Sequence, residues 1–144
     1  MTAQTPTVLK SYFETGDRPT ASQYGDFIDT ACGYKSYVAT LTQAGTAAPV
    51  ATVLQNTIGD IVWTRSEAGR YVGTLANAFV ASKTVVLTSV GLVFSSADSI
   101  VKIATAAVTS VNAVVLLTGT LSALTDDGFG ALGGPISLEI RVYP

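Results

Sequence analysis

The stretch FETGDRPTASQYGDFIDTACG (residues 13–33) carries the strongest helix signals in the chain and precedes a long run with β-strand periodicity. Thr20 is suited to cap a helix, and Gln23 follows three residues later, which is the spacing of a capping box. Tyr24, Phe27, Ile28 and Ala31 then fall on one helix face at i, i+3, i+4 and i+7 spacing. Gly33 follows this periodic run and is a natural helix stop. The stretch predicts an amphipathic helix of about three turns. Residues 8–13, just before it, have helix-like spacing that favours a shorter helical turn, with a strand as the alternative.

From residue 34 onward the apolar residues follow a period of two. The clearest segment is ISLEIRV (residues 136–142), where Ile136, Leu138 and Ile140 alternate with polar neighbours, as a half-buried antiparallel strand requires. The other predicted strands are residues 37–42, 50–54, 61–65, 70–75, 84–90, 91–94, 100–108 and 111–118.

Short strands with regularly spaced turns predict a mainly β fold, an antiparallel β-sandwich or jelly roll of about seven or eight strands. A short N-terminal helical segment precedes it. We expect residues 1–33 to form an arm and amphipathic helix, and residues 34–144 to form the β-sandwich domain.

The strongest hairpin signal joins two of these strands through residues 66–69, a four-residue connection that contains glycine. Trp63 and Tyr71 are expected to face each other across this hairpin, and core packing is favoured over a role as a ligand platform. A second turn is expected at residues 109–110.

The composition is unusually apolar for a chain without a long hydrophobic run. Hydrophobic residues make up 48% of the chain and charged residues only 12%, against a usual charged share of about 25%. The apolar windows at residues 84–94 and 111–117 are shorter than the ~20 residues of a membrane-spanning helix. The N-terminal MTAQTPT lacks the features of a secretory signal. We therefore expect no membrane insertion. We expect instead that other protein copies cover part of the apolar surface of this chain.

Charge and residue content argue against several kinds of chemistry. The net charge is −2 and no cluster of Lys or Arg occurs, so direct nucleic-acid binding is not expected. The chain has no histidine, which excludes triads that depend on it. Cys32 is the sole cysteine, so no intrachain disulfide can form, and we expect it to be a small buried residue near the helix end.

The remaining candidate groups have simpler interpretations. Carboxylates that could act in pairs are interpreted as solvated or turn residues; they are Asp26 with Asp29, Asp126 with Asp127, and Glu67. Residues 128–133 match the G-x-G-x-x-G pattern, but a strand and not a helix follows them, so a flexible loop is predicted. We expect no catalytic, cofactor-binding or metal-binding residues, and no enzyme activity.

Two segments resemble a known family. The first is TGDRPT (residues 15–20), with Lys10 and Phe13 before it and Gln23 after it. The second is LTQAGTAAPVATVLQNTIG (residues 41–59), followed by Val62-Trp63 and Gly69-x-Tyr71. Together they resemble virion structural proteins of tailed bacteriophages, above all head-fibre and tail-fibre proteins of crAss-like phages and their relatives. The resemblance covers about half of the chain.

This resemblance implies a non-enzymatic head-fibre, tail-fibre or capsid-decoration subunit that works by oligomerising and docking on the particle. Its partners are expected to be further copies of itself, as a homotrimer, and other capsid or tail proteins. The protein is expected in the virion, after assembly in the host cytoplasm. The amphipathic helix is placed at a subunit interface or against the base of the sandwich, with residues 1–18 as the attachment arm. The candidate interface residues are Tyr12, Phe13, Tyr24, Phe27 and Ile28.

Two alternatives remain. The first is a carbohydrate-binding or receptor-binding module that recognises a host-surface glycan, for which Phe129 and Tyr143 are the aromatic candidates. The second is a hydrolase that acts through carboxylates at a trimer interface.

Overall fold

The computed structural model describes residues 4–89, 102–120, 122–126 and 135–144, with the backbone alone at positions 29, 32 and 102. The strand predicted at residues 91–94, the glycine-rich loop at 128–133, Phe129 and the Cys32 side chain lie outside this description. The chain divides into two compact units. Unit 1 comprises Met1–Lys35 with Tyr143–Pro144, and unit 2 comprises Ser36–Val142.

Unit 1 contains the two predicted helical segments, α1 (Pro6–Ser11) and α2 (Ala21–Cys32). The capping box of α2 is confirmed. The Thr20 N–H donates to Gln23 Oε1 over 2.8 Å, and the Gln23 N–H donates to Thr20 Oγ1 over 3.3 Å. Gly33 has φ of +51°, which suits its role after the helix end. Local sequence chemistry therefore sets both ends of α2.

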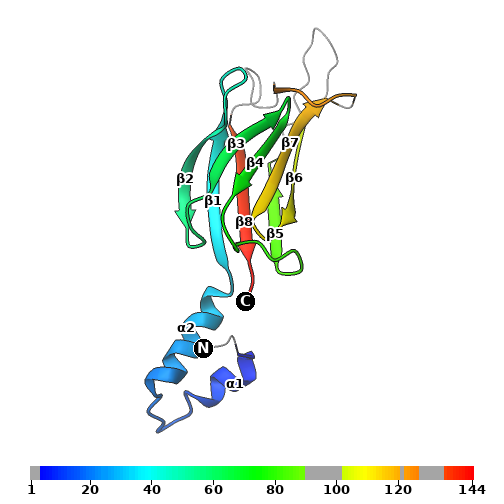
Figure 1. Cartoon of the computed structure of the whole chain (residues 1–144). Coiled ribbons are helices and arrows are strands. Elements are labelled where there is room, and N and C mark those ends of the chain that lie inside the picture. The colour runs from blue at the N-terminus through cyan, green and yellow to red at the C-terminus, as the bar shows by residue number, and fades with distance from the viewer. Residues whose placement is uncertain (1–3, 90–101, 121, 127–134) are drawn as a thin grey trace. The chain divides into compact units, whose positions relative to one another are not determined.

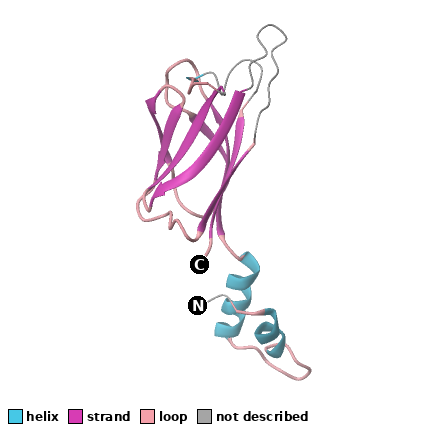
Figure 2. Ribbon diagram, turned by 90° about the vertical axis from the view of Figure 1, so that its right-hand side faces the viewer, coloured by secondary structure: helices cyan, strands magenta, loops and turns pink. Residues whose placement is uncertain are grey.

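Unit 2 is an antiparallel β-sandwich, as the sequence predicts, and Figures 1 and 2 show its two sheets face to face. In the described part of the chain its strands are β1 (Lys35–Thr42), β2 (Val50–Asn56), β3 (Val62–Glu67), β4 (Arg70–Thr74), β5 (Thr84–Thr88), β6 (Lys102–Ser110), β7 (Ala113–Thr120) and β8 (Ile136–Val142). One sheet has the order β2-β1-β8-β5 and the other β3-β4-β7-β6. The edge strands β5 and β6 lie against each other.

The core lies between the sheets and receives alternate residues from each strand. The alternation predicted for β8 is confirmed, because Ile136, Leu138 and Ile140 are 5% or less exposed. The buried hydrophobic cluster consists of Tyr37, Ala39, Leu41, Trp63, Tyr71, Phe79, Ala104, Val114, Leu116, Ile136, Leu138 and Ile140. Burial of this apolar surface is the main force that holds the two sheets together.

The β3–β4 hairpin differs from the expectation in two ways. The connection is shorter, since β3 extends to Glu67 and β4 begins at Arg70, with a register irregularity after Arg65. Trp63 pairs with Gly73, so it does not face Tyr71. The position that a Cβ of Gly73 would take lies 3.0 Å from the Trp63 ring, so the missing side chain makes room for the indole. Both aromatic residues are buried, as core packing predicts.

The β6–β7 turn also differs from the expectation. It lies at Val111 and Asn112, because β6 continues to Ser110. The Asn112 N–H donates to Ser110 Oγ over 3.2 Å, and Asn112 Oδ1 accepts from the Asn77 N–H over 2.7 Å. Asn112 is thus the residue that fixes the turn.

We predict that Gly69→Ala lowers the free energy of unfolding by roughly 2–5 kcal/mol, measured by urea denaturation. Gly69 has φ of +65°, and a Cβ there would collide with Thr118 O and the Thr125 backbone. Gly45→Ala is the matched control. Gly45 has φ of +55° with no described atom within 4 Å of its Cβ position, so only the backbone cost of about 1–2 kcal/mol applies. Equal losses in the two variants would contradict the packing argument.

Candidate functional site

The predicted interface residues of unit 1 form an aromatic cluster at the surface. The Phe13 ring contacts those of Tyr24 and Phe27 edge to face, with centroid distances of 5.8 and 5.6 Å. These rings keep 45–49% of their surface exposed, and Ile28, on the same helix, keeps 57%. Tyr12 is half-buried, with its hydroxyl 3.5 Å from Asp26 Oδ2. The single chain therefore leaves this apolar cluster half exposed to solvent.

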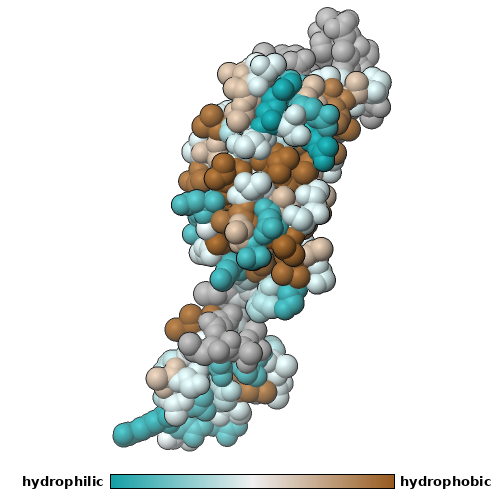
Figure 3. Space-filling model, in the orientation of Figure 1, coloured by the Kyte–Doolittle hydropathy of each residue, from teal (hydrophilic) through white to brown (hydrophobic). Residues whose placement is uncertain are grey.

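A second group of exposed apolar residues lies on the edge strand β2 of the sandwich. Val50, Val53 and Leu54 are 66%, 48% and 67% exposed. Leu54 is the extra residue of a β-bulge, because Val38 pairs with Gln55 and Ala39 with Val53. Figure 3 shows apolar residues reaching the surface of unit 2 among polar ones. A bulge distorts the row of backbone groups on this edge and makes indiscriminate strand pairing less favourable.

A polar cluster around Asp126 joins the two sheets at one end of the sandwich. Arg65 binds the carboxylate with two hydrogen bonds, Nε to Oδ1 at 2.9 Å and Nη2 to Oδ2 at 2.7 Å. The Gly69 N–H donates to Oδ1 over 3.1 Å. The Tyr71 hydroxyl lies 2.9 Å from Oδ1 and 2.6 Å from Gln43 Oε1. Gln43 follows β1 of one sheet, whereas the other three residues belong to the β3–β4 hairpin of the other sheet.

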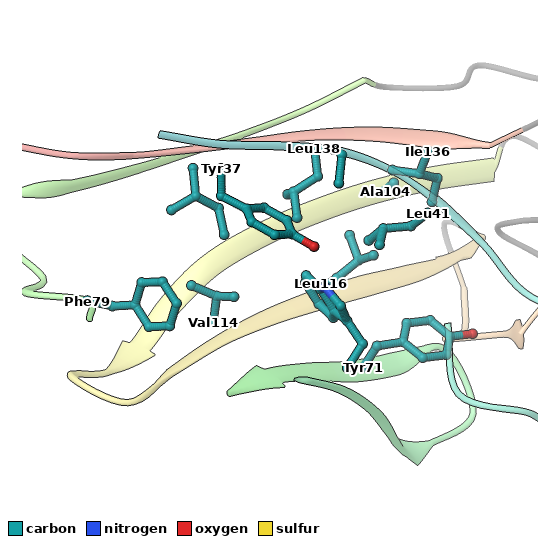
Figure 4. Close-up of a cluster of buried hydrophobic side chains, with 12 residues drawn as sticks. Tyr37, Leu41, Tyr71, Phe79, Ala104, Val114, Leu116, Ile136 and Leu138 are labelled. Carbon is teal, nitrogen blue, oxygen red and sulfur yellow. The ribbon is translucent and has the colours of Figure 1, made fainter. Parts of the chain in front are cut away.

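The electrostatics of this cluster favour a charged Asp126 and a neutral Tyr71. Hydrogen bonds from Arg65, aided by Gly69, Tyr71 and Gln43, hold the pKa of the Asp126 carboxyl well below its usual range. Burial, with the Asp126 charge as a smaller contribution, raises the pKa of Tyr71 to about 12. In Figure 4 the Tyr71 ring lies beside the core and its hydroxyl is directed away from it. A carboxylate held by these donors is a poor base, so the geometry suits a structural clamp.

Sequence reasoning missed the Asp126 cluster. Asp126 was expected to be a turn residue or one of a carboxylate pair, but its charge is matched by Arg65, 61 positions earlier in the chain. No local pattern connects two positions that far apart. Among the other predicted carboxylates, Glu67 forms an exposed ion pair with Arg70 at 3.2 Å. Asp127 lies outside the described residues.

A cavity of about 270 Å³ opens between the edge strands β2 and β3, on the side of the sandwich opposite β5 and β6. Its lining residues are Tyr37, Pro49, Ala51, Val53, Asp60, Ile61 and Trp63. Two of these lining residues carry a buried polar atom, Tyr37 Oη and Trp63 Nε1, that has no hydrogen bond of normal geometry to any described residue. Such atoms are uncommon in folded proteins and call for an explanation.

The described residues contain no group of three His, Cys, Asp or Glu side chains placed to hold a metal ion. In the same residues, no helix has the length and apolarity needed to cross a membrane. Tyr143, one of the two aromatic candidates for glycan recognition, is 39% exposed, and its ring lies 5.3 Å from that of Tyr34.

The fold and these sites define an antiparallel two-sheet β-sandwich that carries a helical unit with an exposed aromatic cluster. Comparisons with protein-family models, with curated proteins and with solved structures give no match.

We predict that Asp126→Asn lowers the free energy of unfolding at neutral pH by roughly 2–3 kcal/mol, because hydrogen bonds to a charged group are lost. The folded-state pKa of Asp126 is below its unfolded value, so its contribution is present above that unfolded value and is lost as the pH falls. Urea unfolding between about pH 5 and pH 2 should therefore show a steep loss of stability for the unaltered protein and a shallower one for the variant.

Glu67→Gln is the control for this experiment. The Glu67 side chain is 59% exposed in its pair with Arg70, so its loss should cost less than about 0.5 kcal/mol and leave the acid dependence unchanged. A variant of Asp126 with the same acid dependence as the unaltered protein would refute the role assigned to this carboxylate.

Proposed function

We propose that this protein is a non-enzymatic structural protein of a bacteriophage virion, a head-fibre, tail-fibre or capsid-decoration subunit that acts by self-association and docking on the particle. The observation that carries the proposal is the half-exposed aromatic cluster of Phe13, Tyr24 and Phe27 in unit 1. The resemblance of residues 15–20 and 41–59 to such proteins supports it from the sequence.

The aromatic cluster has the properties of an association surface. Aromatic residues are enriched in the buried centres of protein interfaces, where they contribute much of the binding energy. Three rings already held edge to face need little further ordering on association, which reduces the entropic cost. Ile28 extends this surface along α2 with the largest exposed fraction of the group, 57%.

Composition supports the same function. Only 12% of the residues are charged, about half of the usual share. β2 adds further exposed apolar residues, among them Val50 and Leu54. A chain with this surface gains stability when other copies cover part of it. Closed cyclic symmetry is the usual result for identical subunits, and we propose a homotrimer that binds other capsid or tail proteins through the N-terminal arm.

The Asp126 cluster suits a subunit that must keep its shape. It ties Gln43 of one sheet to Arg65 and Tyr71 of the other through hydrogen bonds of 2.6–3.5 Å. Directed polar contacts of this kind favour one arrangement of the two sheets over others. A rigid sandwich is what repeated docking on a particle requires.

We predict that the purified protein forms a stable oligomer at micromolar concentration, measured by light scattering coupled to size-exclusion chromatography. Phe27→Ser should weaken association by at least about tenfold, because loss of a central aromatic contact typically costs 2 kcal/mol or more. Unit 2 should keep its folded core, checked by near-ultraviolet circular dichroism, since Phe27 belongs to unit 1.

Val111→Ser is the matched control. Val111 is 48% exposed, similar to Phe27, but it lies in the β6–β7 turn. This variant should keep the oligomer intact. A monomeric unaltered protein, or an oligomer that survives Phe27→Ser, would contradict the proposal.

A further inference from the structure

The cavity between β2 and β3 lies where the sandwich is open. β5 and β6 lie against each other at one side, whereas the opposite edge strands, β2 and β3, flank the cavity. One wall comes from β1 and β2, through Tyr37, Ala51 and Val53. The other comes from the segment leading into β3 and from β3 itself, through Asp60 and Trp63. Residues of both sheets therefore converge on one opening.

Two buried polar side chains make this cavity more than a packing defect. Tyr37 is 1% exposed and Trp63 is 7% exposed, and the Trp63 N–H lies near the Tyr37 hydroxyl. Neither group forms a hydrogen bond of normal geometry with any described residue. Leaving a buried donor or acceptor unpaired is unfavourable, typically by about 1–3 kcal/mol per group. In Figure 4 the Tyr37 side chain extends from β1 into the space between the sheets.

The polar atoms define what a ligand must offer. The Trp63 N–H can only donate, so it requires an acceptor. Burial raises the pKa of the Tyr37 phenol; the nearby Trp63 N–H opposes this, and the Asp60 carboxylate adds to it, so the hydroxyl stays protonated. Asp60 can only accept, and its Oδ1 is oriented by Asn56 Nδ2 at 3.3 Å. A hydroxyl-rich molecule both donates and accepts, and therefore matches all three.

The charge and the size of the cavity further restrict the class of ligand that it can bind. Among the described residues that line the cavity, Asp60 alone carries a charged group, and its carboxylate disfavours an anionic ligand. Pro49, Ala51, Val53 and Ile61 supply apolar surface suited to C–H groups. The volume of about 270 Å³ is below the roughly 300–1,000 Å³ typical of sites for drug-sized ligands. A ligand that fits this volume has the size of one sugar ring or of a similar polyol.

We propose that the β2–β3 cavity binds a neutral, hydroxyl-rich small molecule of the size of a single sugar ring, held by Tyr37, Trp63 and Asp60. This site goes beyond the assembly function and shares no residue with the aromatic cluster of unit 1. It also differs from the one described candidate for glycan recognition, Tyr143, which does not line it.

Trp63 is the only tryptophan of the chain, so its fluorescence reports on this cavity without a label. The purified full chain is titrated at millimolar concentrations with D-glucose, D-galactose, D-mannose and N-acetyl-D-glucosamine. We expect at least one of these sugars to change the Trp63 emission in a saturable manner. D-glucuronate should bind more weakly than D-glucose because Asp60 repels it, and cyclohexanol should bind more weakly because it offers one hydroxyl.

Tyr37→Phe removes one unpaired hydroxyl and keeps the ring. Binding of the responding sugar should weaken by about tenfold, as expected for one lost hydrogen bond. The melting temperature should stay the same or rise, because Tyr37 Oη forms no hydrogen bond of normal geometry with any described residue. Asp60→Asn should weaken sugar binding and reduce the discrimination against D-glucuronate.

Thr84→Val is the matched control. Thr84 Oγ1, in β5, is also buried without a hydrogen-bond partner among the described residues, but Thr84 does not line the cavity. This variant should share the stability effect of Tyr37→Phe and keep full sugar binding.

Three results would overturn the proposal. They are the absence of a saturable response to every sugar, undiminished binding by the Tyr37→Phe variant, and a Trp63 emission that depends on protein concentration without sugar. The last result would mean that a second copy of the chain covers the cavity.

Discussion

The bidentate pair between Arg65 and Asp126 is the interaction on which one end of the sandwich depends. The same carboxylate accepts hydrogen bonds from the Gly69 N–H and the Tyr71 hydroxyl. Gln43, which bonds to the Tyr71 hydroxyl, connects this group to the other sheet. A partly buried carboxylate is favourable only when it is well matched by donors, and here the donors come from the β3–β4 hairpin and from Gln43 after β1. Hydrophobic burial holds the sheets together, whereas this clamp fixes how they meet.

The polar side chains at the β2–β3 side of the sandwich differ in their hydrogen bonding from Asp126 and Tyr71. The Asp126 carboxylate and the Tyr71 hydroxyl find partners within the chain, but Tyr37 Oη and Trp63 Nε1 do not find them among the described residues. The aromatic cluster of unit 1 is likewise incomplete in the single chain, with Phe13 and Phe27 each 45% exposed. A binding partner contributes most at surfaces of these two kinds. It would supply hydrogen bonds in the cavity and apolar contacts at the aromatic cluster of unit 1.

Much of the fold could be predicted because its signals are local. The Thr20–Gln23 capping box and the stop at Gly33 need only neighbouring residues, and both are present in the structure. The alternation in β8 likewise marks Ile136, Leu138 and Ile140 as core positions. The aromatic spacing of Tyr24 and Phe27 predicted one helix face, although it did not show how much of that face the chain would cover.

Spacing along the chain is enough to place the ends of α2, to limit the number of strands to a narrow range and to mark Ile136, Leu138 and Ile140 as core positions. The pairing of Trp63 with Gly73, the ion pair of Asp126 with Arg65, and the cavity that Tyr37 and Trp63 share with Asp60 come from the tertiary structure. Each of these relations joins positions through strand register or sheet packing. Register depends on which strands pair and where bulges fall, and short-range patterns do not specify that.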